Sequence, residues 1–117
     1  MAEETNLPDE LQKQIINGTS SQFTVSKFSS GKQMRSYHDI VKEAWEQSGL
    51  QPFQMPLQGL VQEPFRQAAK AAGRWDLIGN PSGQIGGTLK ERRSAKQILM
   101  DMVEEARETI ADLQQKI

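Results

Sequence analysis

Residues 79–97, GNPSGQIGGTLKERRSAKQ, hold the densest group of residues in this sequence that could do chemistry. Glycines crowd into a turn, four Lys and Arg side chains follow, and a helix is predicted to begin near Ser94. Main-chain amides at such a turn and at a helix N-terminus can bind a phosphate. The stretch matches neither the phosphate loop that ends in Lys-Ser/Thr nor the GxGxxG motif that follows a strand. A loop that turns the chain and then starts a helix is the simpler interpretation.

The other candidates are scattered. His38 is the single histidine, and no serine or cysteine nucleophile set accompanies it, so a surface or capping role is expected. Paired carboxylates such as Glu104 and Glu105 lie on helices whose other face is apolar, which is typical of a solvated face. Trp45 and Trp75 stand among apolar positions and are expected in the core. No set of His, Asp and Glu has metal-ligand spacing, so no metal site is predicted.

Composition narrows the class of protein. The chain has 117 residues, enough for one domain at most, and a net charge of −1, which favours neither nucleic-acid nor membrane-surface binding. No apolar run approaches the about 18 residues of a membrane span, and the acidic start MAEETNLPDE does not resemble a secretory signal. The absence of cysteine excludes disulfides and thiolate sites. A cytoplasmic protein without nucleic-acid or membrane partners is expected.

A few short elements are predicted to position these residues, and the fold class is mainly α with a small β-hairpin (α+β). Pro52 and Pro56 favour an extended segment over residues 50–62. The hairpin is predicted over residues 23–37 with its turn near 29–31, and helices are predicted over residues 8–17, 37–49, 63–73 and 94–117.

The last helix is the most regular. Ser94 and Gln97 fit a capping box, and the helix would be about 35 Å long. Its apolar stripe is longer than the short helices and the hairpin can cover, and exposing it costs about 25 cal/mol per Å². The stripe therefore needs self-association, a partner, or the rest of a longer polypeptide. It consists of Ala95, Ile98, Leu99, Met102, Val103, Ala106, Ile110, Leu113 and Ile117.

Several weak motifs occur in a recognisable order. They are the block FSSGKQMRSYHDIVKEAWE, the segment MPLQGL, the alanine-rich stretch EPFRQAAKAAG, and a GQ..G turn before a closing helix rich in Ile, Val and Glu. In this order and spacing the chain resembles the C-terminal part of the nitronate monooxygenases, also called 2-nitropropane dioxygenases, whose relatives include flavin-dependent enoyl reductases. The resemblance covers nearly the whole chain, and even MAEETNLPDELQKQII looks like the segment after the last barrel strand.

The resemblance implies a flavoprotein oxidoreductase with an FMN-binding (β/α)₈ (TIM) barrel and an inserted α/β domain, which oxidises alkyl nitronates with O₂. Residues 1–75 would be the later part of the inserted substrate-side domain, and residues 76–117 would be the glycine turn and the closing barrel helix. Gly83, Gln84 and Gly86 become cofactor-binding candidates that line the pocket. No catalytic residue is assigned, because the phosphate loops and the catalytic histidine of the family lie upstream, and His38 does not match that histidine.

Departures from the family limit what this chain is expected to do. The typical Trp-Ala-Gly-Gln turn reads NPSGQ, and the usual Gly-Leu-Ile reads GGTLK. Alone, the chain is expected to bind FMN weakly or not at all and to be inactive. In the intact enzyme, the stripe of its last helix would pack on barrel strands that this chain lacks. The alternative is a small helical protein–protein interaction module that uses this helix. A compact homodimer that buries the helix would favour that alternative.

Overall fold

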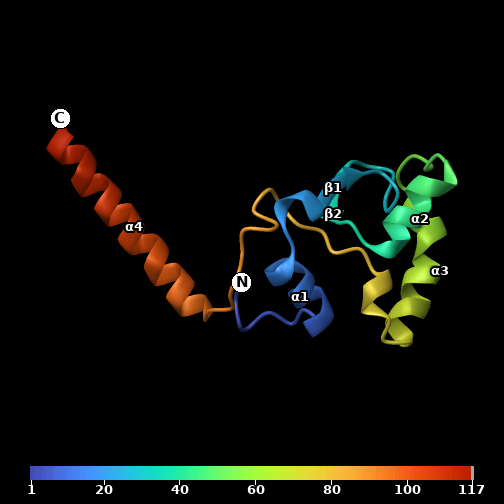
Figure 1. The fold of residues 1–117 in the computed structure, drawn as a ribbon, viewed down its shortest axis with the longest axis horizontal. Coiled ribbons are helices and arrows are strands. Elements are labelled where there is room, and N and C mark those ends of the chain that lie inside the picture. The colour runs from blue at the N-terminus through green and yellow to red at the C-terminus, as the bar shows by residue number, and fades with distance from the viewer. Residues whose placement is uncertain (117) are drawn as a thin grey trace. The chain divides into compact units, whose positions relative to one another are not determined.

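The computed structural model describes residues 1–116 and divides the chain into two compact units (Figure 1). The larger unit is Leu7–Lys90, and the smaller combines Met1–Asn6 with the chain from Glu91 onward. Residue 75 lies within the larger unit, which continues through residues 80–82, where the chain hydrogen-bonds to the hairpin. The assignment of the parts to an inserted domain and a barrel stays a prediction.

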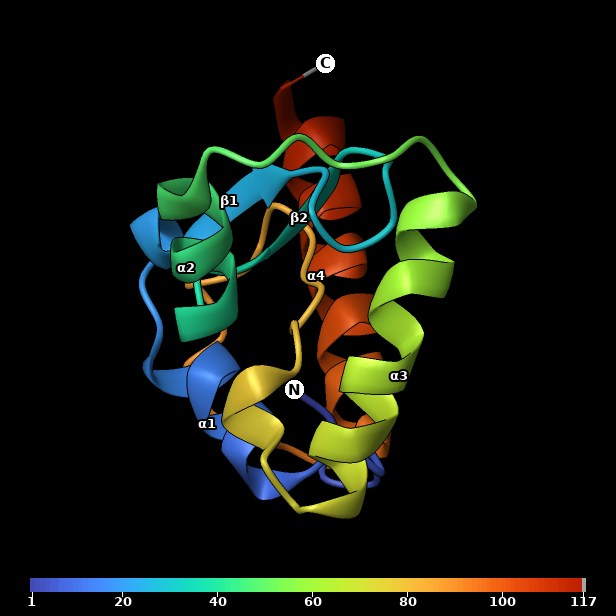
Figure 2. The same ribbon diagram turned by 90° about the vertical axis from the view of Figure 1, so that its right-hand side faces the viewer.

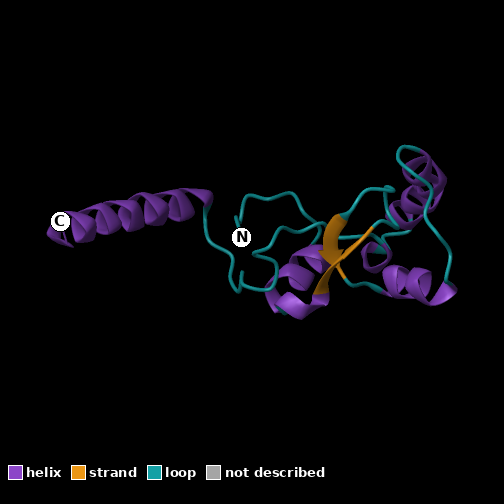
Figure 3. Ribbon diagram, turned by 90° about the horizontal axis from the view of Figure 1, so that it is seen from above, coloured by secondary structure: helices purple, strands orange, loops and turns teal. Residues whose placement is uncertain are grey.

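The larger unit is built around the predicted hairpin, which is confirmed (Figure 3). Strand β1 (Phe23–Ser26) pairs antiparallel with β2 (Met34–Tyr37). The chain then returns beside β2, where the amide of Tyr37 donates to the oxygen of Asn80 at 3.0 Å. The buried apolar core of the unit is small: Leu11, Phe23, Phe28, Ala69 and Ile78.

Helices α1 (Asp9–Asn17) and α2 (Ile40–Ser48) confirm their predictions and show the sequence signals that place them. Pro8 precedes α1, and two acidic residues lie in its first turn, where the helix dipole favours negative charge. Gly49 ends α2 in the left-handed conformation with φ of 69°. A short 3₁₀ turn, Trp75–Leu77, contacts α1, α2 and α3 and joins them (Figure 2).

Helix α3 (Leu57–Ala71) contradicts the sequence prediction. A helix limited to residues 63–73 after an extended segment is wrong: Pro56, not Pro64, precedes the first turn, and Pro64 lies inside the helix. The helix begins early because two of its glutamines are anchored by tertiary contacts. Gln58 and Gln62 both donate from Nε2 to the main-chain oxygen of Phe28, at 2.6 and 2.7 Å.

The smaller unit joins the two ends of the described chain. Ala2 and Arg93 form a parallel bridge, in which the amide of Glu3 donates to the oxygen of Arg93 at 2.9 Å. Helix α4 (Ala95–Lys116) follows directly. Ser94 accepts from the amide of Gln97 at 3.1 Å, but the side chain of Gln97 donates to Asp101, so only half of the predicted capping box forms.

Nothing in the smaller unit covers the apolar stripe of α4. No residue from Ala95 to Lys116 is buried, and large apolar side chains such as Leu99 and Met102 are 61% and 63% exposed. This confirms that the stripe lacks a partner within its own unit. Ile117, predicted as its last member, lies outside the described residues. Within residues 1–116, no helix has the length and apolarity that crossing a membrane requires.

Candidate functional site

The glycine turn of residues 83–88 is closely packed against the hairpin. Gly83 and Gln84 are exposed, whereas Gly86 is buried. A Cβ on Gly86 would lie 3.0 Å from the ring of Phe23. Gly87 has a φ of +90°, and a Cβ on it would lie 2.2 Å from the main-chain nitrogen of Ser20, so no side chain fits there. These two glycines are therefore required by close backbone packing and by a left-handed conformation.

Two main-chain amides of the same turn are already bonded within it. Binding an anion there would require free main-chain amides. The amide of Gly86 instead donates to the oxygen of Gly83, and the amide of Thr88 donates to the oxygen of Ile85, each at 3.0 Å. The cofactor-binding role of Gly83, Gln84 and Gly86 stays a prediction, and only the exposed Gly83 and Gln84 are placed to contact a group held by other residues.

The basic residues after the turn do not form one cluster. Lys90 belongs to the larger unit, where its Nζ donates to the oxygen of Gly18 at 2.6 Å. Arg92 belongs to the smaller unit and donates to the oxygen of Glu3 at 3.2 Å. Arg93 pairs with carboxylates of its own unit. These three side chains thus have local partners, which favours structural roles for them.

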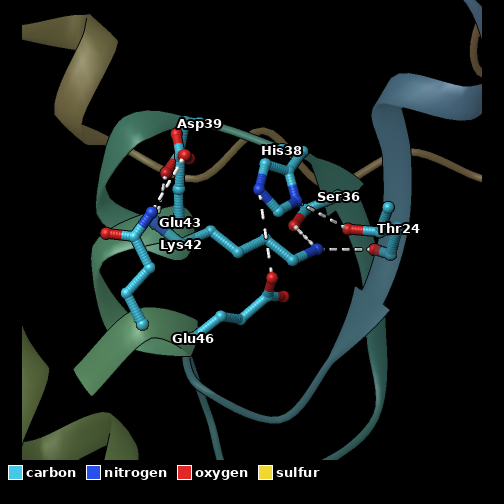
Figure 4. A network of polar contacts seen from close by, with 8 residues as sticks. Thr24, Ser36, His38, Asp39, Lys42, Glu43 and Glu46 are labelled. Carbon is cyan, nitrogen blue, oxygen red and sulfur yellow. Dashed lines mark hydrogen bonds and ion pairs between the residues drawn. The ribbon is translucent and has the colours of Figure 1, made fainter. Parts of the chain in front are cut away.

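A buried lysine forms the centre of the most developed polar network (Figure 4). Lys42 is 0% exposed, and its side chain extends from α2 toward β1. Its Nζ donates to the main-chain oxygen of Thr24 at 2.6 Å and to Oγ of Ser36 at 3.4 Å. Burial lowers the pKa of Lys42, and the charges of Glu46 and Asp39 oppose that shift only in part.

Asp39, not His38, caps helix α2. Its Oδ1 accepts from the amide of Lys42 at 2.9 Å, while its buried Oδ2 has no hydrogen-bond partner in residues 1–116. Burial raises the pKa of the Asp39 carboxyl, although the hydrogen bond from the amide of Lys42 lowers it. The cap is therefore a buried carboxylate that is only half satisfied.

His38 lies beside this network. Its Nδ1 is 3.2 Å from Oγ1 of Thr24, and its Nε2 is 3.9 Å from the carboxylate of Glu46. A histidine oriented by a hydroxyl and a carboxylate could move a proton. The lysine beside it, Lys42, is fully buried and cannot reach a substrate, so the network as a whole is not arranged as an active site. The network therefore ties α2 to the hairpin, and no described group of His, Asp or Glu could hold a metal ion.

Sequence reasoning did not find Lys42, because a lysine in an amphipathic helix is normally solvated. The available signal was the spacing of Asp39 and Lys42, which is that of a cap and its third residue. Trp45 and Trp75 are half-buried rather than in the core, and Trp45 packs on Phe28 with ring centroids 6.3 Å apart.

Hollows of the larger unit lie apart from the glycine turn. One of about 350 Å³ lies between the hairpin turn and the end of α2, and another of about 400 Å³ lies along α3. A smaller hollow of about 170 Å³ has a mainly apolar lining with Arg66 and two serines at its edge. Its apolar side chains are those of Phe28, Met34, Val41, Phe65 and Leu77. None of Gly83, Gln84 and Gly86 lines these hollows.

Comparison with known proteins gives one informative similarity. Over 96% of its length, the chain is 32% identical to the protein Rv1533 of Mycobacterium tuberculosis, which is provisionally named a monooxygenase. The chain spans only 32% of the length of that relative. No family model matches the chain. No solved structure matches it. The similarity relates the chain to about a third of that protein.

Proposed function

We propose that this chain is the C-terminal part of a nitronate monooxygenase-type flavoenzyme, which oxidises alkyl nitronates with O₂ and uses FMN. The observation that carries the proposal is the parallel pairing of Ala2 with Arg93 directly before α4. The relationship to a provisionally named monooxygenase about three times as long agrees with it, because the chain spans 32% of that protein.

Parallel pairing has consequences for what surrounds it. Two parallel strands need a long crossover between them, and here the crossover is the whole larger unit, Leu7–Lys90. Parallel sheets occur almost only where helices cover both faces. In the proposed enzyme, Ala2 and Arg93 would belong to two neighbouring strands of the barrel, with the larger unit inserted between them and α4 after the second. One such pair cannot form a sheet, so the remaining strands would come from polypeptide beyond this chain.

The exposed stripe of α4 fits the same proposal. A helix after a strand in an α/β fold packs its apolar side on the sheet. Val103, Ile110 and Leu113 are 48%, 57% and 54% exposed, so the stripe is available for such packing. In the proposed enzyme, α4 closes the barrel and the larger unit forms a wall on the substrate side. The flavin would be held chiefly by the other part, since the family's phosphate loops lie upstream of the segment that this chain resembles.

A chimeric protein tests this proposal. The part of Rv1533 that this chain does not match is joined to the chain, and the product is compared with each part alone. We expect the chimera to retain FMN through gel filtration and to consume O₂ with an alkyl nitronate such as the anion of 2-nitropropane. We expect the chain alone to leave flavin fluorescence unchanged at micromolar concentration.

Opposite results would contradict the proposal. Micromolar FMN binding with nitronate turnover by the chain alone would show that it is a complete enzyme. If the chimera folds and binds FMN but has no activity with nitronates, the flavoenzyme assignment stands and the nitronate assignment is wrong. Two parts that fold separately, with α4 still exposed in the chimera, would remove the assignment of α4 as a barrel helix.

A further inference from the structure

We propose that the hollow of about 170 Å³ in the larger unit, here called the Arg66 hollow, binds a small carboxylate with a short alkyl chain. Its lining comes from the hairpin turn, α2, α3 and residues 77–81. The proposal goes beyond the proposed function, because it concerns residues of the larger unit alone and requires no flavin. It rests on the size of the hollow, on a glycine in its wall and on the charged residue at its edge.

The Arg66 hollow is larger than an ordinary packing defect. Protein interiors hold few voids larger than one water molecule. An apolar cavity of about 150 Å³ can hold one benzene molecule. The wall of the Arg66 hollow includes the buried ring of Phe28 and the half-buried side chains of Val41 and Leu77. It therefore suits an apolar group of about four to six carbon atoms.

Gly79 lines the hollow and contributes no side chain to it. A Cβ at this position would meet no atom within 4 Å, and Gly79 does not have a positive φ. Neither the backbone conformation nor close packing therefore requires a glycine here, in contrast to Gly87. What the glycine does is leave the space of a side chain open beside the hollow.

The polar edge of the hollow suits an anion. Arg66 is the single charged residue among the described residues that line it, and its side chain is 39% exposed. Its Nη1 is 3.8 Å from the carboxylate of Glu63, and so long and exposed a pair engages the guanidinium only weakly. Oγ of Ser30 accepts from the amide of Lys32 at 3.3 Å, which leaves its hydroxyl hydrogen for another acceptor.

A carboxylate fits these donors and the apolar wall together. The planar fork of an arginine donates two parallel hydrogen bonds to the two oxygens of a carboxylate. Small-molecule sites are commonly apolar, with a few polar groups that fix the orientation of the ligand. Inorganic phosphate would also pair with Arg66, but it has no apolar part to fill the hollow. A monocarboxylate of about five carbons occupies both the wall and the edge.

Titration of the full chain with pentanoate, followed by the NMR chemical shifts of main-chain amides, tests the proposal. We expect saturable shifts at Ser29, Val41 and Leu77, with a dissociation constant of about 1 mM. Pentanamide has the same chain without the charge, acetate has the charge without the chain, and inorganic phosphate has charge alone. Each of these three is expected to bind at least about tenfold more weakly.

Arginine variants test the charge at the edge. Arg66→Met keeps a long side chain without its charge and is expected to weaken pentanoate binding at least about tenfold, while pentanamide binds as before. The matched control Arg74→Met removes an exposed arginine that pairs with Asp76 outside the hollow, and it should leave binding unchanged. Glu63→Gln removes the competing carboxylate and is expected to tighten pentanoate binding.

Filling variants test the apolar wall. Gly79→Leu is expected to abolish binding because it occupies the hollow, and Val41→Phe should do the same from α2. The matched control Gly83→Leu changes a glycine that also has no atom within 4 Å of a new Cβ but lies outside the hollow, so binding should persist. Circular dichroism checks that each variant folds.

Three results would overturn the proposal. The first is a lining whose amides do not shift at pentanoate concentrations that should saturate the site. The second is equal binding of pentanoate and one of its three controls. The third is unchanged binding by folded Arg66→Met, or by folded Gly79→Leu and Val41→Phe. Carboxylate binding by the chain alone uses neither flavin nor O₂, so this proposal can fail while the proposed function stands, and the reverse.

Discussion

The buried ammonium group of Lys42 donates to the main-chain oxygen of Thr24 at 2.6 Å. This contact joins the second helix to the first strand across residues that are far apart in sequence. Both oxygen atoms that accept from Lys42 are uncharged, so the positive charge lacks a directly bonded carboxylate. Burial of a charge in such surroundings favours its neutral form, which is why the pKa of Lys42 is lowered.

The first prediction concerns pH. Since the pKa of Lys42 is lowered from its usual value of 10.5, the unfolded chain binds this proton more tightly than the folded chain. The free energy of unfolding should therefore rise as the pH increases from 7 toward 10. We expect Lys42→Met to flatten that rise, measured by urea unfolding followed through tryptophan fluorescence. Lys27→Met, on an exposed side chain, should keep the slope of the parent chain. Equal slopes for the two variants would contradict the prediction.

The second prediction concerns the cap of α2. Asp39→Ala removes the acceptor for the amide of Lys42 and should lower the free energy of unfolding by about 1 kcal/mol. Asp39→Asn keeps a good cap and removes the buried carboxylate, so it should be less harmful at neutral pH. Burial raises the pKa of Asp39 above 3.8, so the folded chain binds this proton more tightly than the unfolded chain. The contribution of Asp39 to the free energy of unfolding of the parent chain should therefore increase as the pH falls toward 3.8. A loss from Asp39→Asn as large as from Asp39→Ala would show that the charge matters more than the cap.

The third prediction separates glycines that are needed from those that are not. Gly87→Ala introduces a Cβ at a φ of +90° and against the amide of Ser20, and it should cost at least about 1–3 kcal/mol. Gly83→Ala lies in the same turn, has no atom within 4 Å of the new Cβ, and should change stability by less than about 0.5 kcal/mol. Thermal unfolding of both variants measures the difference. Similar melting temperatures would contradict the packing role of the turn.

The fourth prediction concerns the anchor of α3. Gln58 is 1% exposed, accepts from the amide of Phe53 at 3.0 Å and donates to Phe28. Gln58→Leu leaves the amide of Phe53 without its acceptor and removes the buried hydrogen bond to the oxygen of Phe28, and should cost about 1–3 kcal/mol. Gln67→Leu makes the same change at an exposed position of α3 and should be nearly neutral. Chemical unfolding of the two variants tests the difference, and equal stability would show that Gln58 does not fix the early start of the helix.

Local sequence signals were sufficient where structure is decided locally. Gly49 marked the end of α2, the serine and glycine turn marked the hairpin, and Ser94 marked the start of α4. They failed where tertiary contacts decide. Pro64 looked like a first-turn proline, yet the anchored glutamines continue the helix through it.

The candidate site was less predictable than the fold. A glycine-rich turn before a basic stretch has the same sequence whether its amides are free for an anion or bonded within the turn. The structure shows that the amides of Gly86 and Thr88 are bonded within the turn and that Gly86 packs closely on the ring of Phe23. The burial of Lys42 was equally hidden, because it depends on Thr24 and Ser36 from the hairpin.

The last prediction concerns the dynamics of α4 when nothing covers it. An isolated helix gains little from propensity alone, and most helical stability in proteins comes from packing of the apolar face. In the chain alone, the amides in the middle of α4, near Ala106, should therefore exchange with solvent deuterium at close to the unprotected rate, within about tenfold. Amides of the β1–β2 ladder should exchange much more slowly. Adding the missing part in the chimera should raise protection along α4. Strong protection of α4 in a monomeric chain would mean that its apolar stripe is already covered, and the proposal that it awaits a sheet would be wrong.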